Sequence, residues 1–242
     1  MQIPLEVINL SKIYDDKEAV KNISFKVNKN EIIGILGPNG CGKTTTIGMI
    51  LGLLKPTNGR VLINGIEIEN KRVDLLDNLN FISPYIELPK KLTVKQNLEV
   101  YGRLYDVKNL NSKIDYLSEK LRLNEIIYKI TGELSSGQKN RVSLAKSIIN
   151  EPTVLLLDEP TASLDPETGD FVRSFLEDYQ KEKESSILLA SHNMAEVERL
   201  CSSVIMMNKG VIIDHGNPQK LINKHGRKNM EEVFLKLTRE KI

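Results

Sequence analysis

The stretch Gly37–Thr45, GPNGCGKTT, decides the fold expected of this chain. It directly follows the apolar run IIGIL at residues 32–36, which is typical of a buried strand, and a helical pattern begins at Lys43. Glycines allow the backbone to wrap so that successive N–H groups face phosphate oxygens, and the helix adds the positive end of its dipole. A G-x₄-GK-[ST] pattern between a strand and a helix therefore predicts a phosphate-binding loop.

Each residue type in this loop has a chemical role in that prediction. The Lys43 ammonium is expected to reach the β and γ phosphates, and the Thr44 hydroxyl is expected to bind Mg²⁺. Cys41 is expected to contribute its backbone, although a thiol beside a lysine and a helix start is also the setting of a reactive cysteine. An ordinary glycine-rich turn is the alternative, but it gives no reason for Lys-Thr at this offset. The expected nucleotide contacts are Gly37, Pro38, Asn39, Gly40, Cys41, Gly42, Lys43, Thr44 and Thr45.

Composition and charge argue against several classes of protein. The 34 basic and 32 acidic residues leave a net charge of +2, which gives no bulk attraction to nucleic acid or to an acidic membrane surface. The two cysteines, Cys41 and Cys201, lie far apart and lack the spacing of metal ligands or of a disulfide framework. No apolar run approaches the roughly 20 residues of a membrane span, and the first residues do not resemble a secretory signal. We therefore expect a cytosolic chain.

The pattern of apolar residues changes twice along the chain. Strand-like stretches fill the first part, where Asn64-Gly65 predicts a hairpin turn, and helical spacing then replaces them until short apolar runs return. Short apolar strands that alternate with helices predict an α/β protein with a largely parallel sheet covered on both faces. We expect a single domain, 1–242, with a nucleotide-binding core and β subdomain at 1–83 and 151–224, a helical insertion at 84–150, and a C-terminal helix at 225–242.

Two acidic residues are expected at the carboxyl edge of the predicted sheet. Asp158 and Glu159 directly follow the apolar residues 154–157, and ligands of open α/β sheets bind at that edge. We assign Asp158 to Mg²⁺ and Glu159 to the water that attacks the γ phosphate. A pair of solvated acids at a strand end is the alternative, and the phosphate loop makes the catalytic interpretation the better one.

A second helix start resembles an anion site. Ser135 in LSSGQKNRVSLAKSII is expected to cap a helix, which leaves the amides of Ser136 and Gly137 as unpaired donors. Because the first loop already holds the triphosphate of its own chain, these donors are candidates to bind the nucleotide of another copy. Taken alone, the same pattern is also that of an ordinary capped helix.

Together these residues resemble the ATP-binding subunit of an ATP-binding cassette (ABC) transporter over nearly the whole chain. GPNGCGKTT resembles the Walker A loop, VLLLDEP the Walker B strand, LSSGQ the LSGGQ signature, SLD at 163–165 the D-loop, and His192 in ASHN the switch histidine. The resemblance implies a P-loop NTPase with a RecA-like core, an N-terminal antiparallel β subdomain and an inserted helical subdomain.

The resemblance also implies how the site is built. Two subunits enclose two ATP molecules, so that Ser135, Ser136, Gly137 and Gln138 of one copy face the nucleotide on Lys43 of the other, with Asp165 communicating between them. His192, at the end of the predicted strand SILLA, would act with Glu159 in catalysis. Tyr14 matches the aromatic residue that stacks on adenine, although tyrosine is also a common strand residue.

The expected function is that of an ATPase subunit that drives a separate integral membrane permease from the cytoplasmic face of the membrane. It would act as a homodimer or as a heterodimer with a related subunit, with ATP and Mg²⁺ as cofactors and without nucleic acid. Similarity points to exporters of the drug, antibiotic or polysaccharide type. The alternatives are a soluble ABC ATPase that acts on ribosomes or DNA, and a dimerisation switch with little turnover.

Two positions depart from the family pattern. Ser136 replaces a signature glycine and keeps the backbone donor. Pro84 stands where the family has a glutamine that contacts Mg²⁺ and the attacking water. Proline has no side-chain donor or ligand, and Gln96 lies in the following helix, so neither residue replaces that glutamine. Ser83 offers a weaker oxygen ligand next to this position.

We predict that Pro84 slows hydrolysis or changes its coupling without abolishing it. Pro84→Gln should therefore raise ATP turnover and alter its dependence on Mg²⁺, which steady-state assays across a Mg²⁺ titration would measure. Unchanged turnover together with an unchanged Mg²⁺ dependence would contradict this account.

Overall fold

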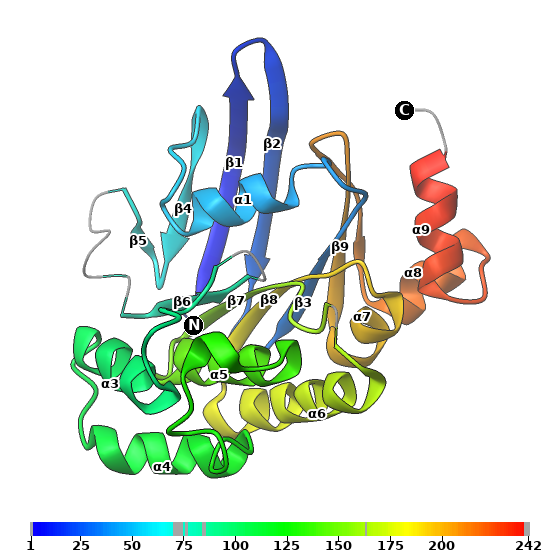
Figure 1. The fold of residues 1–242 in the computed structure, drawn as a ribbon. Helices are drawn as coiled ribbons and strands as arrows, with labels where there is room; N and C mark the ends of the chain where they lie inside the picture. Colours follow the sequence, from blue (N-terminus) through cyan, green and yellow to red (C-terminus); the bar gives the residue numbers. More distant parts are fainter. Residues whose placement is uncertain (1, 70–74, 76, 84–85, 163, 240–242) are drawn as a thin grey trace.

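The strands of the protein form two sheets that pack on either side of one helix (Figure 1). The computed structural model describes residues 2–69, 75, 77–83, 86–162 and 164–239. An antiparallel sheet has the order β2-β1-β4-β5 and consists of β1 (Leu5–Tyr14), β2 (Lys17–Val27), β4 (Asn58–Ile63) and β5 (Ile66–Glu67). A second sheet has the order β10-β9-β3-β8-β7-β6 and consists of β3 (Ile32–Leu36), β6 (Leu79–Ile82), β7 (Val154–Asp158), β8 (Ser186–Ala190), β9 (Ser203–Asn208) and β10 (Val211–Gly216).

The second sheet is parallel except for β10, which pairs antiparallel with β9. The helices that accompany the two sheets are α1 (Lys43–Ile50), α3 (Val94–Leu104), α4 (Leu110–Lys120), the 3₁₀ turn η1 (Thr131–Glu133), α5 (Ser136–Ile148), α6 (Pro166–Lys183), α7 (Met194–Leu200), α8 (Pro218–His225) and α9 (Met230–Arg239). This mixed α/β architecture confirms the fold class expected of a P-loop NTPase.

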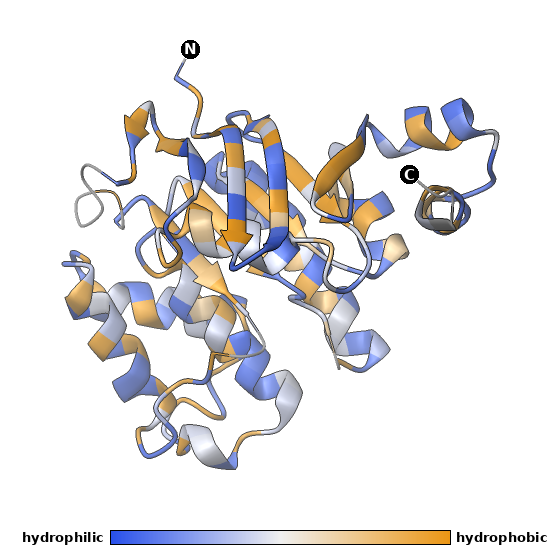
Figure 2. Ribbon diagram, turned by 90° about the horizontal axis from the view of Figure 1, so that it is seen from above, coloured by the Kyte–Doolittle hydropathy of each residue, from blue (hydrophilic) through white to orange (hydrophobic). Residues whose placement is uncertain are grey.

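Both faces of the parallel sheet are buried, and alternate residues of one strand enter different cores. In β3, Ile33 and Ile35 join the core that contains α1 and the antiparallel sheet, whereas Ile32 and Leu36 join the core under the other helices. Strands buried on both faces read as continuous apolar runs. The antiparallel sheet instead alternates hydrophobic and hydrophilic residues along its long strands (Figure 2), because one of its faces meets solvent.

Local sequence signals set several of these boundaries. The hairpin predicted at Asn64-Gly65 is confirmed: both residues have positive φ, 50° and 77°, and Ile63 pairs with Ile66 across the turn. The helix expected to begin at Lys43 does so, and it ends at Ile50, before the chain turns at Gly52, whose φ is 64°. The strand β6 has no counterpart in the sequence-based prediction, and it forms because it pairs in parallel with β7.

The helical segment after β6 folds into three α-helices, and α3 packs against both α4 and α5 (Figure 1). Residues at helical spacing, such as Leu98, Ile114, Leu117 and Leu121, are fully or almost fully buried in the shared core. Within the described ranges, no helix combines the length and the apolar character needed to cross a bilayer.

Gly59 provides a test of the packing between β1 and β4. Its φ is +83°, and a Cβ built there would lie 2.2 Å from the backbone oxygen of Asn9. Gly65 also has a positive φ, +77°, but a Cβ there would have only the side-chain nitrogen of Gln2 as a neighbour, at 3.9 Å. We expect Gly65→Ala to cost about 1–2 kcal/mol of unfolding free energy from backbone strain alone. Gly59→Ala should cost roughly 1–3 kcal/mol more because the backbone must also move. Urea denaturation of both variants measures the difference, and equal losses would contradict it.

Candidate functional site

The loop between β3 and α1 is held by backbone contacts that leave no room for side chains. A Cβ on Gly37 would lie 2.4 Å from the carbonyl oxygen of Met207 in β9. A Cβ on Gly42, whose φ is +111°, would lie 2.7 Å from the carbonyl oxygen of Ala19. Glycine is therefore required at both positions, and the loop presents bare backbone at this end of the sheet.

The amino end of α1 concentrates positive charge in this loop. Gly42 is the N-cap, no side chain caps the helix, and the first turn carries no acidic residue. The first amides of a helix point outward and carry the positive end of its dipole. The Lys43 ammonium, 9% exposed, donates to the carbonyl oxygens of Gly37 at 2.5 Å and Pro38 at 3.3 Å, so it sits within the loop itself. Such a cluster of donors suits the oxygens of a phosphate chain.

The loop opens into a cleft of about 760 Å³. The cleft brings residues from distant parts of the sequence together: the phosphate loop, the end of β7, the hairpin between β1 and β2, and the turn after β9. Tyr14 stands at the end of β1, 42% exposed, with the Lys12 ammonium 5.1 Å from its ring centroid. The residues expected from sequence that line this cleft are Tyr14, Asn39, Gly40, Gly42, Lys43, Thr44, Thr45, Asp158 and Glu159.

Basic residues on the wall of this cleft were missed by sequence reasoning. Lys17 and Lys21 come from β2, and Lys209 comes from the turn between β9 and β10. Each of these side chains is exposed, and the wall that they share with Asp16 and Glu18 carries charges of both signs. The pair Lys209-Gly210 after an apolar run is a turn signal that could have pointed to this wall, and both residues have positive φ.

Asp158 is a buried carboxylate at the last position of β7, 4% exposed. Burial and the neighbouring charge of Glu159 raise the pKa of Asp158, while the Lys43 ammonium and the hydrogen bond from Ser83 Oγ lower it. Ser83 Oγ lies 3.5 Å from Asp158 Oδ2. Thr44 and Asp158 thus bring two hard oxygen donors to one cleft, which is the donor set that Mg²⁺ uses beside phosphates. Among the described residues no cluster of three or more His, Cys, Asp or Glu forms an all-protein metal cage.

Glu159 has a backbone conformation that is rare for its residue type. Its φ is +53°, and its amide donates to the carbonyl oxygen of Ala190 at 2.8 Å, which holds the turn after β7 against the end of β8. Left-handed backbone at a residue other than glycine costs about 1–3 kcal/mol, and Glu151 and Glu184 adopt it as well, at turns outside this cleft. Its side chain meets His192, with 2.6 Å between Glu159 Oε2 and His192 Nδ1. The Glu159 side chain is 18% exposed and lines the cleft, whereas that of His192 is 71% exposed and does not line it.

The predicted cap at the start of α5 is confirmed. The Ser135 amide donates to Gln138 Oε1 at 3.0 Å, and the Gln138 amide donates to Ser135 Oγ at 3.3 Å, which forms a capping box. This arrangement occupies two amides and leaves those of Ser136 and Gly137 at the exposed helix end.

The start of α6 lies beside the start of α5. Asp165 is the N-cap of α6, and its Oδ1 accepts from the Thr168 amide at 2.9 Å, a bond that lowers the pKa of Asp165. A Cβ on Gly137 would lie 3.3 Å from Thr168 Cγ2, so the two helix ends are in contact. Among the residues that the structure describes, neither helix end lines the phosphate cleft. Ser163, in the same D-loop, lies outside the described residues.

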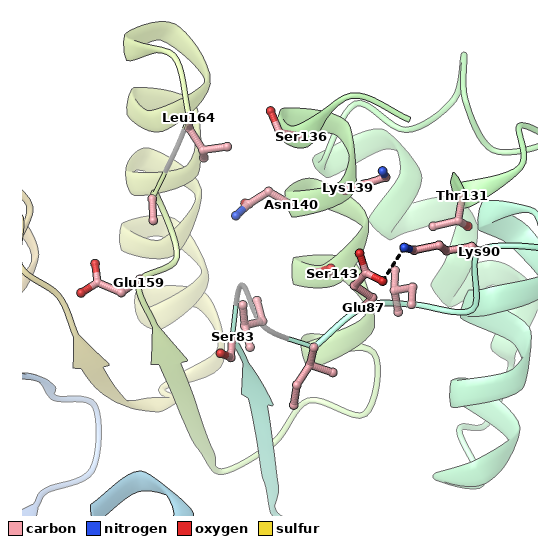
Figure 3. Close-up of a pocket in the computed structure, with 14 residues that line it drawn as sticks. Ser83, Glu87, Lys90, Thr131, Ser136, Lys139, Asn140, Ser143, Glu159 and Leu164 are labelled. Atoms are coloured by element: carbon pink, nitrogen blue, oxygen red, sulfur yellow. Dashed lines mark ion pairs between the residues drawn. The ribbon is translucent and has the colours of Figure 1, made fainter. Parts of the chain in front are cut away.

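A second cavity, of about 280 Å³, lies between the end of β6, the start of α5 and the segment after Glu159 (Figure 3). Its walls combine exposed apolar side chains, such as Ile86 at 51%, with the Glu87–Lys90 ion pair at 2.7 Å. Glu159 lines this cavity as well as the phosphate cleft, so one residue borders both. Pro84, at the departure from the family pattern, lies outside the described residues.

The hypothesis of a reactive Cys41 is wrong. The Cys41 side chain is 2% exposed, and burial raises its pKa more strongly than the Lys43 charge and the local backbone hydrogen bonds lower it. A raised pKa leaves less thiolate at neutral pH, and the thiolate is the reactive form. Cys41 therefore contributes its backbone to the loop, as expected from the sequence, and its side chain fills space in the core.

Comparisons with known proteins identify a common family for these features. A family model described as "ABC transporter" matches residues 20–162. The chain is 31% identical over 238 residues to the ABC transporter ATP-binding protein NatA of Bacillus subtilis, covering 96% of each chain. It is 32% identical to the Nod factor export ATP-binding protein I of Rhizobium sp., covering 96% of this chain and 77% of that protein. A solved structure described as the ATP-binding subunit of an ABC transporter aligns with a TM-score of 0.89 at 26% identity, covering 96% of this chain and 98% of that chain.

The burial of Cys41 predicts slow chemistry. In the native protein at neutral pH, iodoacetamide should label Cys41 at least about tenfold more slowly than in urea, because the thiol is both inaccessible and protonated. Cys201 is also buried, with its pKa raised by burial, and serves as the internal comparison. Mass spectrometry of the alkylated peptides gives both rates. Rapid labelling of native Cys41 would contradict the burial described here.

Proposed function

This chain belongs to the ABC transporter family and is an ATP-binding subunit that hydrolyses ATP, and on that premise we propose that it powers a membrane export system. One observation supports the hydrolytic part of the proposal most strongly: residues of the phosphate loop, Asp158 and Glu159 line a single cleft. The cleft therefore combines a site for the triphosphate with acidic groups at the position where the terminal phosphate would lie.

In this proposal the chain's own residues bind and orient ATP. The amides at the start of α1 and the Lys43 ammonium bind the β and γ phosphates, and Tyr14 contacts the base. Thr44 and Asp158 would hold Mg²⁺, which when bound neutralises charge on the phosphates and favours in-line attack. Gly37 and Gly42 already fix the backbone of the loop, whereas the Lys43 ammonium would exchange its contacts with the Gly37 and Pro38 carbonyls for phosphate oxygens.

Glu159 and His192 are assigned to the hydrolytic step. Both contacts from His192, from its Nδ1 at 2.6 Å and from its backbone amide at 3.4 Å, are made to Glu159 Oε2. We therefore assign Oε1 to the attacking water, whose proton Glu159 accepts. His192 orients that carboxylate, and we assign its exposed ring to a contact with the γ phosphate. A positioned base contributes roughly 10²- to 10⁴-fold to a rate.

A second copy would complete the site. The start of α5, with the amides of Ser136 and Gly137, and the adjacent Asp165 are exposed but lie outside the phosphate cleft of their own chain. Helix starts with unpaired amides bind anions. We propose that two subunits, identical or related, pack so that this end of α5 in each closes on the γ phosphate held by the other.

The second cavity is assigned to the permease. It has an apolar wall with charged residues at its rim, which suits a short amphipathic helix, and it borders Glu159 (Figure 3). A helix seated there would lie beside the catalytic turn, and in this way movement of the permease would be coupled to hydrolysis. The subunit would then reside at the cytoplasmic face of the membrane, held by the permease. The name of the Nod factor export relative supports an exporter, and we extend this to cargo of the drug, antibiotic or polysaccharide type.

Glu159→Gln tests the assignment of the base. The substitution keeps size and shape but removes the proton acceptor, so turnover should fall roughly 10²- to 10⁴-fold while ATP binding persists. Phosphate release and binding of a fluorescent ATP analogue measure the two quantities. Because ATP is then trapped, the variant should also form a stable dimer with ATP and Mg²⁺ in size-exclusion chromatography.

Glu231→Gln is the matched control, since Glu231 is exposed in the first turn of α9 and lines neither cavity that borders Glu159. It should retain full turnover. Wild-type turnover in Glu159→Gln would contradict the catalytic assignment. If Glu159→Gln stays monomeric with ATP, Mg²⁺ and its membrane component present, the proposal of a site shared by two subunits is contradicted. Co-purification with ribosomes or DNA in place of a membrane protein would contradict the transport proposal.

A further inference from the structure

A carboxylate lies buried beneath the turn that carries Glu159. Glu196 belongs to the first turn of α7 and is 1% exposed. Glutamate is almost never fully buried unless its oxygens are paired. Here Oε1 accepts a hydrogen bond from Thr161 Oγ1 at 2.8 Å, and Oε2 accepts one from Ser191 Oγ at 2.5 Å. Each oxygen of one side chain is thus tied to a different hydroxyl.

The two hydroxyls belong to different loops. Thr161 follows Glu159 by two residues in the segment after β7, and Ser191 directly precedes His192 after β8. Glu196 therefore connects the turn of the assigned base to the turn of the assigned histidine through one buried side chain. This connection is separate from the direct contact between Glu159 and His192, whose imidazole is 71% exposed and open to competition from water.

The backbone around Ser191 reinforces the connection. Ser191 Oγ also accepts from the Asn193 amide at 3.0 Å, and Asn193 Oδ1 accepts from the Glu196 amide at 3.2 Å. The loop, the cap of α7 and the Glu196 side chain thus form a closed network of hydrogen bonds. In a dry interior such a network is rigid when every member is satisfied.

Stability alone gives a poor reason for this arrangement. Burial of a charged group is costly, and replacing buried ionic groups by apolar side chains of similar volume is often neutral or stabilising. What an apolar residue at this position cannot do is fix the relative position of two hydroxyls in two separate loops.

We propose that Glu196 is a positioning residue that holds the loops of Glu159 and His192 in register for hydrolysis. The inference rests on the roles assigned to those two residues in the proposed function. Glu196 does not line the phosphate cleft. Its loss should therefore lower the rate of the chemical step and leave ATP binding intact.

The test compares three single variants and one double variant of the full chain in steady-state ATPase assays. Glu196→Leu keeps the approximate volume and removes both acceptors, so kcat should fall at least about tenfold, while KM for ATP stays within about twofold. Glu196→Gln should restore most of kcat, because its amide oxygen accepts from one hydroxyl and its amide N–H donates to the other. Thr161→Val, which cuts one of the two ties, should lower kcat, and in combination with Glu196→Leu it should cause little further loss.

Glu198→Leu is the matched control, because it places the same substitution on the same helix at an exposed carboxylate whose contact is with the Met230 amide. It should keep wild-type kcat. The proposal is overturned if Glu196→Leu keeps wild-type kcat, if Glu196→Gln is as impaired as Glu196→Leu, or if KM rises in step with the loss. Should Glu196→Leu fail to fold in thermal melts, Thr161→Val decides, and wild-type kcat in that variant overturns the proposal.

Glu159→Gln separates this inference from the function on which it rests. An inactive Glu159→Gln together with a fully active Glu196→Leu would overturn the positioning role alone. An active Glu159→Gln would overturn the assignment of the base, and with it the purpose assigned to Glu196.

Discussion

The close approach of backbone to backbone at the phosphate loop is the constraint on which the rest of the structure depends. Gly37 passes under the carbonyl of Met207 and Gly42 passes beside that of Ala19, at distances that exclude any side chain. These contacts tie the loop to β9 on one side and to the antiparallel sheet on the other. Because α1 begins at the same point and is buried between the two sheets, the direction of its dipole is fixed as firmly as the core itself.

The parallel sheet places the acidic residues opposite this loop. Asp158 pairs with Ala190 at the ends of β7 and β8, and the Glu159 amide continues the pairing for one more hydrogen bond. Neighbouring strands that end together bring their following loops together, so Glu159 and His192 meet although 33 residues separate them. The site is therefore a property of strand register, and the side chains add chemistry to positions that the sheet has already defined.

Sequence patterns predicted what local interactions decide. The loop at Gly37–Thr45 and the hairpin at Asn64-Gly65 have turn and glycine requirements that a few adjacent residues satisfy, and the capping box at Ser135 is equally local. Sequence reasoning also named part of the lining of the cleft but missed Lys17, Lys21 and Lys209, and it named His192, which does not line the cleft. The chemical roles of the named residues stay predictions. Sequence reasoning failed where contacts between distant segments decide the structure. The strand β6 forms only with β7 as its partner, and Cys41 is buried by neighbours that its own sequence context does not reveal. The network at Glu196 escaped notice for the same reason.

The positive φ of Glu159 limits which residues could replace it during evolution. Asparagine, aspartate and glycine adopt this backbone conformation readily, whereas β-branched side chains are disfavoured there. A related subunit that has lost turnover and keeps only the ATP-driven change of shape is therefore expected to carry glutamine, which keeps the shape of glutamate, or one of those three residues at this position. The backbone conformation of this one turn thus restricts the substitutions by which such a subunit could lose hydrolysis and keep its response to nucleotide binding.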